Sequence, residues 1–219
     1  MAPGAATSQG DYVLPGFASQ VQAVLEIPRV ELLTTHGICS CAMMALKATV
    51  NGIKVGEQKQ ALVVSSELSS RLLKKQRYEA AKEVIGLNRE LDFNTEFLRW
   101  MLSDGAGAVI LSHQPKRHGL SFRIDWVRSF SHADSFPLCM SIGHSNKDSA
   151  APKSWQDYPT YGEAEADGAL LIRQDVRLLE NIVKLGVDGF LALVEEGSVN
   201  VQGIDHFLCH YSSHYFRGK

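Results

Sequence analysis

The chain has 219 residues, 45% of them hydrophobic and 21% charged, and its formal net charge is -2 at pH 7. This apolar fraction suits the packed core of one large or two small domains and argues against disorder. The charges are of both signs and interspersed, which argues against a nucleic-acid or membrane surface. We therefore expect small molecules or proteins as partners.

Targeting signals and metal motifs are not evident. The longest apolar runs, residues 106–111 and 168–172, are far shorter than the roughly 20 residues of a membrane span. Residues 1–11 have neither the basic end nor the apolar centre of a signal peptide, so a soluble, cytoplasmic protein with free cysteines is expected. Cys39-Ser-Cys41 is too closely spaced for the usual zinc pairing, and no metal site is expected.

The N-terminal region contains one short predicted helix. Residues 1–10 are rich in Ala, Gly, Ser and Thr and are expected to form loose coil. After Pro15, apolar residues recur at helical spacing from Phe17 to Leu25, and Pro28 follows them. These features predict a short amphipathic helix that leads into a strand.

Residues 30–55 form the stretch around which the chain is organised. An apolar run at residues 30–33 predicts a buried strand, Gly37 permits a sharp turn, and apolar spacing from Met43 onward predicts a helix that ends near Gly56. Cys39 then lies at the helix N-terminus, where unpaired N–H groups and the helix dipole favour its thiolate. The alternative is that Cys39 and Cys41 are small buried apolar residues.

A second strand is predicted at residues 60–68, which completes a strand–helix–strand unit. Such units place functional groups beyond the carboxyl ends of their strands, where Cys39 and Glu67 both fall. The following residues, 69–91, are expected to form a partly helical basic excursion, either a landing site for phosphates or a solvated helix face.

The Gly-rich residues 105–108 lead into a predicted buried strand at residues 109–111. They lack a full phosphate-loop motif, and Asp104 is interpreted as a turn residue or a buried hydrogen-bond acceptor. The polar residues 113–119 mark a boundary between an N-terminal half, residues 1–113, and a C-terminal half, residues 114–219.

In the second half, alternation predicts a strand at residues 120–127, and residues 130–161 are expected to be irregular. Residues 163–196 form the longest periodic segment, with one apolar stripe and Gly197 as its stop. A short strand is then predicted at residues 206–210, ending in His210.

Four motifs occur in a recognisable order. They are Cys39 with Ala45-Leu46, the strand at residues 61–64 with Glu67, Asp104-Gly-Ala-Gly-Ala108, and Asp205-His-Phe-Leu-Cys-His210. Their order resembles the thiolase superfamily, and most closely the β-ketoacyl-ACP synthase III branch of condensing enzymes.

The resemblance implies an α/β protein with a thiolase-like layered α/β/α fold of two related halves, both incomplete in this chain. It implies that Cys39 accepts an acyl group from coenzyme A or acyl carrier protein and that His210 stabilises the enolate of a malonyl or 3-oxoacyl partner. The backbone N–H of Cys39 would contribute to an oxyanion hole. A homodimer is expected, with acyl-CoA and acyl-ACP as substrates and no permanently bound cofactor.

The sequence also departs from this family. The chain ends before the position of the family's catalytic asparagine and starts inside the first half, so we expect a fragment of a longer enzyme. His210-Tyr-Ser-Ser213 replaces the usual His-Gln-Ala-Asn, which suggests a divergent subgroup, for example the ketosynthase/cyclases of dialkylresorcinol type. Cys41 replaces a glycine, and Cys39 is preferred as nucleophile because Ala45-Leu46 falls at the family's offset from it.

Several alternatives stay open. His36 is either a turn residue or a pocket residue, His206 is interpreted as structural, and His214 reaches a pocket only if the terminal loop folds back. The chain as a whole is a condensing acyltransferase, a noncatalytic partner subunit, or a cysteine hydrolase with a Cys39 and His210 dyad.

Overall fold

The computed structural model of the protein describes residues 2–84, 93–145 and 151–210. The chain divides into two compact units, which are described here one at a time. Unit 1 consists of Met1–Ser69 and Ser103–Ser135, and unit 2 consists of Ser70–Leu102 and Phe136–Lys219. The predicted division into two related halves at residue 113 stays a prediction.

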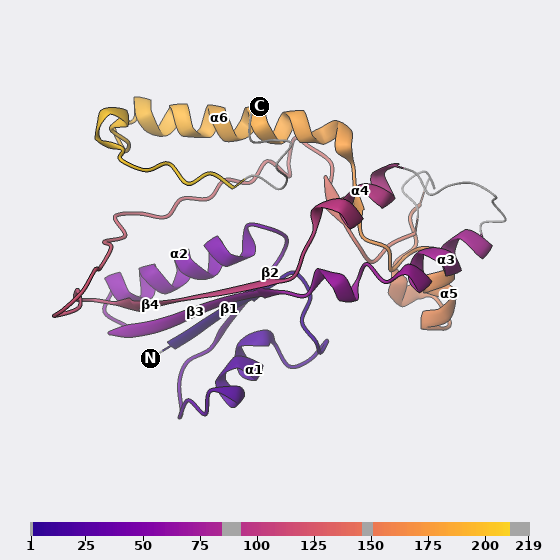
Figure 1. The fold of residues 1–219 in the computed structure, drawn as a ribbon, viewed down its shortest axis with the longest axis horizontal. Helices are drawn as coiled ribbons and strands as arrows, with labels where there is room; N and C mark the ends of the chain where they lie inside the picture. Colours follow the sequence, from indigo (N-terminus) through magenta and orange to yellow (C-terminus); the bar gives the residue numbers. More distant parts are fainter. Residues whose placement is uncertain (1, 85–92, 146–150, 211–219) are drawn as a thin grey trace. The chain divides into compact units, whose positions relative to one another are not determined.

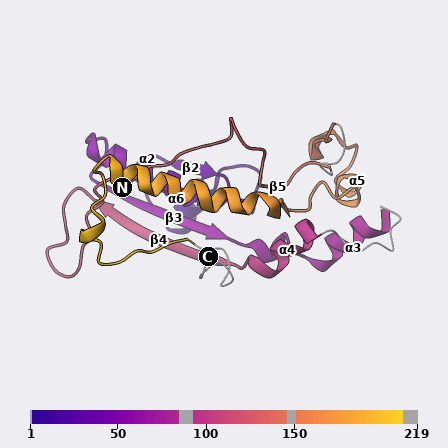
Figure 2. The ribbon, with the colours of Figure 1, turned by 90° about the horizontal axis from the view of Figure 1, so that it is seen from above.

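Unit 1 is built on a mixed sheet. Its strands are β1 (Ala2–Thr7), β2 (Leu33–His36), β3 (Gln60–Glu67) and β4 (Gly105–Ser112), in the order β2-β1-β3-β4. β1 is parallel to both β2 and β3, whereas β4 is antiparallel to β3. The opposite directions of β3 and β4 are visible in Figure 2.

Two helices cover the sheet of unit 1. Helix α1 (Phe17–Val24) and helix α2 (Cys41–Lys54) both pack on β1, and Figure 1 shows them on opposite faces of the sheet. Both helices were predicted from apolar spacing, and β3 was predicted as the strand that follows α2. Unit 1 therefore has the layered α/β/α arrangement expected of a thiolase-like fold.

The expectation of loose coil at residues 1–10 was wrong, because β1 is an inner strand of the sheet. Ala5 and Ala6 are fully buried, and a Cβ added at Gly4 would lie only 2.9 Å from Thr49 Oγ1 of α2. The close approach of α2 to β1 at Gly4 leaves little room for a larger side chain at that position. A run of small residues lacks the alternation of large apolar and polar residues by which strands are detected.

The strands predicted at residues 30–33 and 109–111 were expected to be buried, and this was wrong for both. β2 begins only at Leu33, which is 37% exposed, while Val109 and Ile110 of β4 are 49% and 68% exposed. Both strands lie at the edges of the sheet, where fewer neighbours cover them. The strand predicted at residues 120–127 is also absent, since these residues have no regular secondary structure.

Unit 2 contains mainly helices. Its helices and strands are α3 (Lys75–Val84), α4 (Phe93–Met101), β5 (Met140–Ser141), α5 (Tyr161–Ala166), β6 (Arg173–Gln174) and α6 (Leu179–Glu195). β5 and β6 pair in an antiparallel fashion. Short 3-10 helices occupy Trp155–Asp157, Val176–Leu178 and Val201–Gly203, and a further one at Ser69–Arg71 spans the boundary between the units.

The basic segment predicted at residues 69–91 is partly helical, as expected, within the residues that the structure describes. Tyr78 of α3 is 2% exposed and packs with Ala81 and Leu171, and the guanidinium of Arg99 lies 4.6 Å from the centre of its ring. Arg77 pairs with Glu165 of α5 at 3.5 Å. These contacts favour the structural interpretation of this segment over a phosphate landing site.

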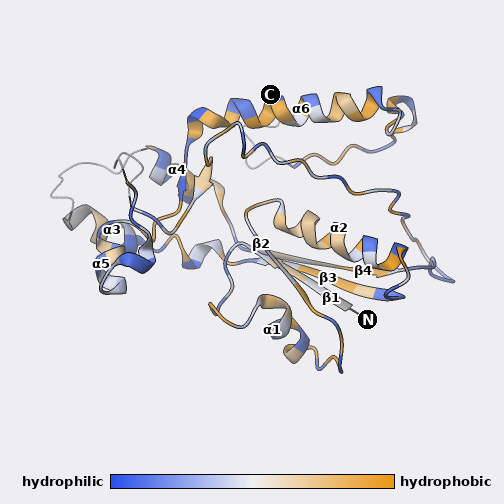
Figure 3. Ribbon diagram, turned by 180° about the vertical axis from the view of Figure 1, so that it is seen from behind, coloured by the Kyte–Doolittle hydropathy of each residue, from blue (hydrophilic) through white to orange (hydrophobic). Residues whose placement is uncertain are grey.

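The single long helix suggested by the periodicity of residues 163–196 is divided in the structure. Helix α5 ends at Ala166, and Gly168 then adopts a positive φ of 71°, so the chain turns before β6. Helix α6 begins only at Leu179, and Gly197, at φ 73°, follows its end as predicted. Figure 3 shows apolar and polar segments alternating along α6.

The strand predicted at residues 206–210 is absent, since these residues have no regular secondary structure. A strand requires a neighbouring strand to satisfy its backbone groups. In residues 2–84, 93–145 and 151–210, no helix is both long and apolar enough to cross a membrane.

Candidate functional site

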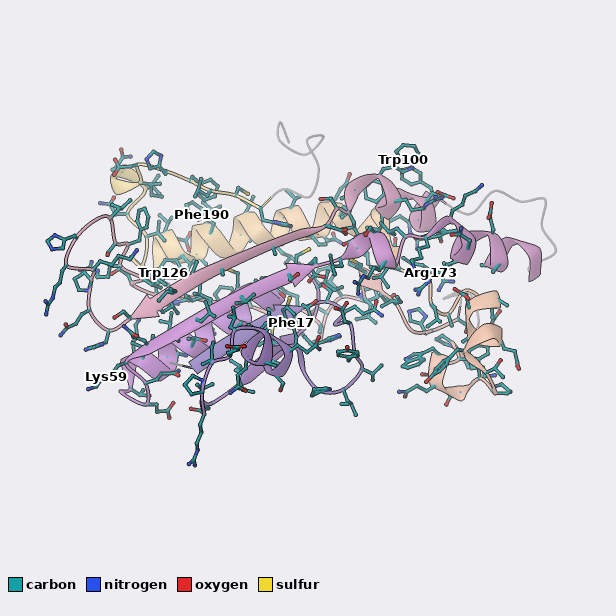
Figure 4. The ribbon with its side chains drawn as sticks, turned by 60° about the horizontal axis from the view of Figure 1, so that its bottom comes forward. Phe17, Lys59, Trp100, Trp126, Arg173 and Phe190 are labelled. Atoms are coloured by element: carbon teal, nitrogen blue, oxygen red, sulfur yellow. The ribbon has the colours of Figure 1, made fainter. Side chains whose placement is uncertain are left out.

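The side chains that could take part in catalysis lie along one edge of the unit 1 sheet. Because β1, β2 and β3 are parallel, their carboxyl ends lie at the same edge, with Thr7 opposite His36 and Ala6 opposite Ser65. β4 runs in the opposite direction, so Glu67 pairs with its first residue, Gly105. Lys59 lies beside the opposite end of β3, as Figure 4 shows. We refer to the edge formed by Ser8, residues 36–41, Glu67 and Asp104 as the carboxyl edge.

The turn between β2 and α2 carries Cys39. Gly37 has a φ of 154°, a region that glycine adopts more readily than other residues. The helix has Ser40 as its N-cap and begins at Cys41, so Cys39 immediately precedes the N-cap. Thr35 Oγ1 donates a 2.9 Å hydrogen bond to the carbonyl oxygen of Cys41 and so ties the start of the helix to β2.

The two cysteines of this turn have different surroundings. Cys41 is 2% exposed and packs in a core cluster with Ala6, Ala45 and Val63. Cys39 is exposed. The interpretation as a small buried apolar residue therefore fits Cys41, whereas Cys39 is the thiol that a substrate can reach.

Glu67 is anchored at the same edge by a residue that the sequence interpretation missed. Glu67 Oε1 accepts hydrogen bonds from the backbone N–H of Ser8 at 2.6 Å and from Ser8 Oγ at 2.9 Å. Ser8 directly follows β1. It escaped notice because residues 1–10 were interpreted as coil, which left no reason to place Ser8 beside β3.

The electrostatic setting of Cys39 differs from the expectation of a favoured thiolate. Partial burial of the thiol is the largest influence and raises its pKa, the Glu67 carboxylate raises it further, and a hydrogen bond from its own backbone N–H lowers it. The net result is a pKa above the ordinary thiol value. Burial and Glu67 also raise the pKa of Cys41. These surroundings therefore disfavour the thiolate form of Cys39.

The remaining candidate residues are divided between the carboxyl edge, which includes His36 and Asp104, and unit 2. His36 is the last residue of β2 and is exposed, and Asp104 is exposed just before β4, which rules out a buried acceptor. His206 and His210 belong to unit 2 and are exposed, so the structure describes Cys39 and His210 in different units. His214 lies outside the described residues.

A metal centre receives no support from the side chains at this edge. In the described ranges, which omit residues 1, 85–92, 146–150 and 211–219, no group of three or more His, Cys, Asp or Glu side chains is placed to hold a metal ion. The groups that the carboxyl edge offers for chemistry are the thiol of Cys39, the carboxylates of Glu67 and Asp104, the imidazole of His36 and backbone N–H groups.

Comparisons with a family model and with individual known sequences find similarity to the same family of enzymes. Residues 35–126, which include Cys39 and Glu67, match the family of 3-oxoacyl-[acyl-carrier-protein (ACP)] synthase III. The chain is 32% identical over 106 residues to β-ketoacyl-[acyl-carrier-protein] synthase III of Rhodospirillum centenum, covering 48% of this chain and 27% of that protein. The enzyme of the same name from Bradyrhizobium diazoefficiens is 26% identical over 210 residues, covering 95% of this chain and 54% of that protein.

Solved structures show the fold. A tetronic acid condensing enzyme is similar with a TM-score of 0.62 and 19% identity, covering 94% of this chain and 53% of that chain. A Xanthomonas campestris OleA structure with bound lauric acid and lauroyl-CoA is similar with a TM-score of 0.57 and 18% identity, covering 94% of this chain and 53% of that chain.

These comparisons confirm two predictions. The chain resembles β-ketoacyl-ACP synthase III-like condensing enzymes, and its fold is a thiolase-like α/β fold. The chain spans between about a quarter and about half of the length of these curated relatives.

Proposed function

We propose that this chain carries the acyl-accepting site of a condensing acyltransferase, with Cys39 as the nucleophile. The enzyme would join an acyl thioester to a malonyl- or 3-oxoacyl-ACP in a fatty acid or polyketide-type pathway. The observation that supports the proposal best is the position of Cys39, exposed at the junction of β2 and α2 within the region that matches the synthase III family.

In the first half-reaction the sulfur of Cys39 attacks the carbonyl carbon of the acyl thioester. The bond from that carbon to the donor sulfur breaks, and the donor leaves as free thiol with the proton that Cys39 gives up. Backbone N–H groups at the start of α2 point out of the helix end and suit the oxygen on which negative charge develops. The product is acyl-Cys39.

In the second half-reaction a malonyl partner loses CO2, and the electrons of the broken carbon–carbon bond form an enolate. The enolate carbon attacks the carbonyl carbon of acyl-Cys39, the carbon–sulfur bond breaks, and the Cys39 thiolate is regenerated. We propose that His210 donates a hydrogen bond to the enolate oxygen. A 3-oxoacyl partner enters the same step after deprotonation instead of decarboxylation.

The donor is proposed to be carried by coenzyme A or acyl carrier protein, as in the enzymes that this chain resembles. We also propose a homodimer. Exposed apolar side chains on α6, among them Val183, Val187 and Leu191, offer apolar surface that association with another chain would cover.

Mass spectrometry tests the acyl-accepting role directly. The chain is incubated with a panel of acyl-CoA thioesters, and intact mass and peptide fragments are recorded for the wild type and for the Cys39→Ala and Cys41→Ala variants. We expect a mass increase of one acyl group that survives Cys41→Ala and is lost in Cys39→Ala.

Other outcomes separate the alternatives. An adduct that persists in Cys39→Ala but disappears in Cys41→Ala would assign the nucleophile to Cys41. An adduct that turns over in water alone, with no malonyl partner, would indicate a cysteine hydrolase. A folded wild-type chain that forms no adduct would contradict the proposal and favour a noncatalytic partner subunit.

A further inference from the structure

The carboxyl edge holds one anion whose position is fixed by the fold. Gly4 and Ala6 of β1 lie under α2, since a Cβ at Gly4 would meet Thr49 and Ala45, and Ala6 packs against Cys41. Successive residues of a strand alternate between faces, so Ser8 continues this α2-facing row beyond the end of β1.

The same alternation applies to β3. Ala61 and Val63 are buried, and Val63 packs against Cys41. Glu67 lies four residues after Val63 and therefore faces the same side of the sheet. Its carboxylate accepts both hydrogen bonds from Ser8 on this face, so it is held beneath the N-terminal end of α2.

A negative charge at this point has two consequences. It is stabilised by the positive end of the helix dipole and by the two Ser8 hydrogen bonds. It also opposes a second negative charge on the thiol that precedes the same helix, because two anions then share one electropositive helix end. The Glu67 carboxylate, on the face of the sheet that α2 covers, thus weakens the effect of the helix end on Cys39.

We propose that Glu67 is a positioning residue that, anchored by Ser8, adds to the effect of burial in keeping Cys39 in its thiol form. The inference deepens the proposed function, since it concerns the reactivity of the same cysteine. A protonated thiol resists oxidation and alkylation far better than a thiolate.

The pH dependence of Cys39 alkylation tests the inference. Iodoacetamide is applied between pH 6 and pH 10.5, and modification is followed on the tryptic peptide of residues 30–47, where fragment ions separate Cys39 from Cys41. The other titratable groups of this edge are Cys41 on α2, His36 at the end of β2 and Asp104 before β4. We expect the pH at which Cys39 of the wild type reaches half of its maximal alkylation rate, the alkylation midpoint, to lie above that of an unstructured cysteine peptide.

Glu67→Gln is the decisive variant. The glutamine side-chain oxygen can still accept both Ser8 hydrogen bonds, so the geometry is kept while the charge is lost. We expect the alkylation midpoint to fall, and the rate at pH 7.5 to rise at least about threefold, which corresponds to half a pKa unit. The limiting rate at high pH should stay the same.

Ser8→Ala is the matched control. It removes the hydroxyl bond but retains the backbone N–H bond and the charge of Glu67, so its midpoint should stay close to that of the wild type. Equal shifts in Ser8→Ala and Glu67→Gln would attribute the effect to loosened structure and overturn the inference. An unchanged midpoint in Glu67→Gln would overturn it as well.

The assay also separates this inference from the proposed function. Alkylation reports the protonation of Cys39 whether or not the chain transfers acyl groups. A wild-type midpoint at or below that of the peptide contradicts the role of Glu67 without any variant. Failure to form an acyl adduct, with a Glu67-dependent midpoint intact, contradicts the acyltransferase alone.

Discussion

Gly4→Ala probes the packing of β1 beneath α2, the contact that the carboxyl edge depends on. A Cβ at this position would lie 2.9 Å from Thr49 Oγ1, whereas ordinary van der Waals contact begins at 3.4 Å. Thr49 can yield only by rotating away, and this breaks its 2.7 Å hydrogen bond to the carbonyl oxygen of Ala45. The alternative is a shift of β1, which is held by β2 and β3 on both sides.

The size of the destabilisation follows from the costs of these two responses to the added Cβ. Loss of the Thr49 hydrogen bond costs about 1 kcal/mol. Overpacking of a tight core costs about 1–3 kcal/mol. The gain from replacing glycine by alanine in a strand offsets about 0.5–1 kcal/mol of this. The lost hydrogen bond together with the low end of the overpacking cost comes to about 2 kcal/mol before this offset, so we expect Gly4→Ala to lower the free energy of unfolding by about 1–1.5 kcal/mol.

Urea unfolding followed by circular dichroism at 222 nm measures the effect as a shift in midpoint at constant slope. Gly107→Ala in β4 is the matched control, because no atom lies within 4 Å of its added Cβ. We expect this control to keep its stability or to gain up to about 1 kcal/mol, because alanine is favoured over glycine in a strand.

A double-mutant cycle isolates the contact itself. Thr49→Ala removes the obstructing Oγ1, so Gly4→Ala should cost about 1 kcal/mol less in the Thr49→Ala background than in the wild type. Strictly additive effects, or a Gly4→Ala variant as stable as the Gly107→Ala control, would refute the packing of β1 under α2.

Three further variants test other contacts by the same urea assay. Thr34→Val removes the Oγ1 that accepts the Ala18 N–H at the start of α1 at 3.1 Å, and a cost of about 1 kcal/mol is expected; no loss would deny this capping role. Tyr78→Phe removes a buried hydroxyl without a hydrogen-bond partner among the described residues, so stability should hold or rise by up to about 1 kcal/mol, and a clear loss would reveal a hidden partner. Asp188→Ala breaks an exposed pair with Lys184 and should change stability by less than about 0.5 kcal/mol, with a larger effect contradicting its surface role.

Some aromatic residues of the chain lie on the surface and not in the core. Trp100 on α4 is 87% exposed, and Figure 4 shows its side chain pointing away from the helix. Leu98, two residues earlier on the same helix, is fully buried. Hydrophobic identity alone therefore does not decide which face of α4 packs; the helical period does.

The sequence by itself determined the elements that have a strong period. Apolar residues at helical spacing located α1 and α2, and the apolar run before Glu67 located β3, because each of these elements has one face that must be buried. The order of strand, helix and strand also placed Cys39 and Glu67 at one edge. That inference requires only that β2 and β3 be parallel to each other. In the structure both strands are parallel to β1, which lies between them.

Only the tertiary structure revealed β1, the anchoring of Glu67 by Ser8, and the direction of the Cys39 pKa. β1 consists mainly of small residues, which suit its close approach to α2 at Gly4, and a run of small residues carries no periodic signal. The hydrogen bond between Ser8 and Glu67 joins residues 59 positions apart, a pairing that no local pattern contains. The helix end favours a thiolate, but burial and a neighbouring carboxylate outweigh it, and both depend on what the fold packs around the thiol.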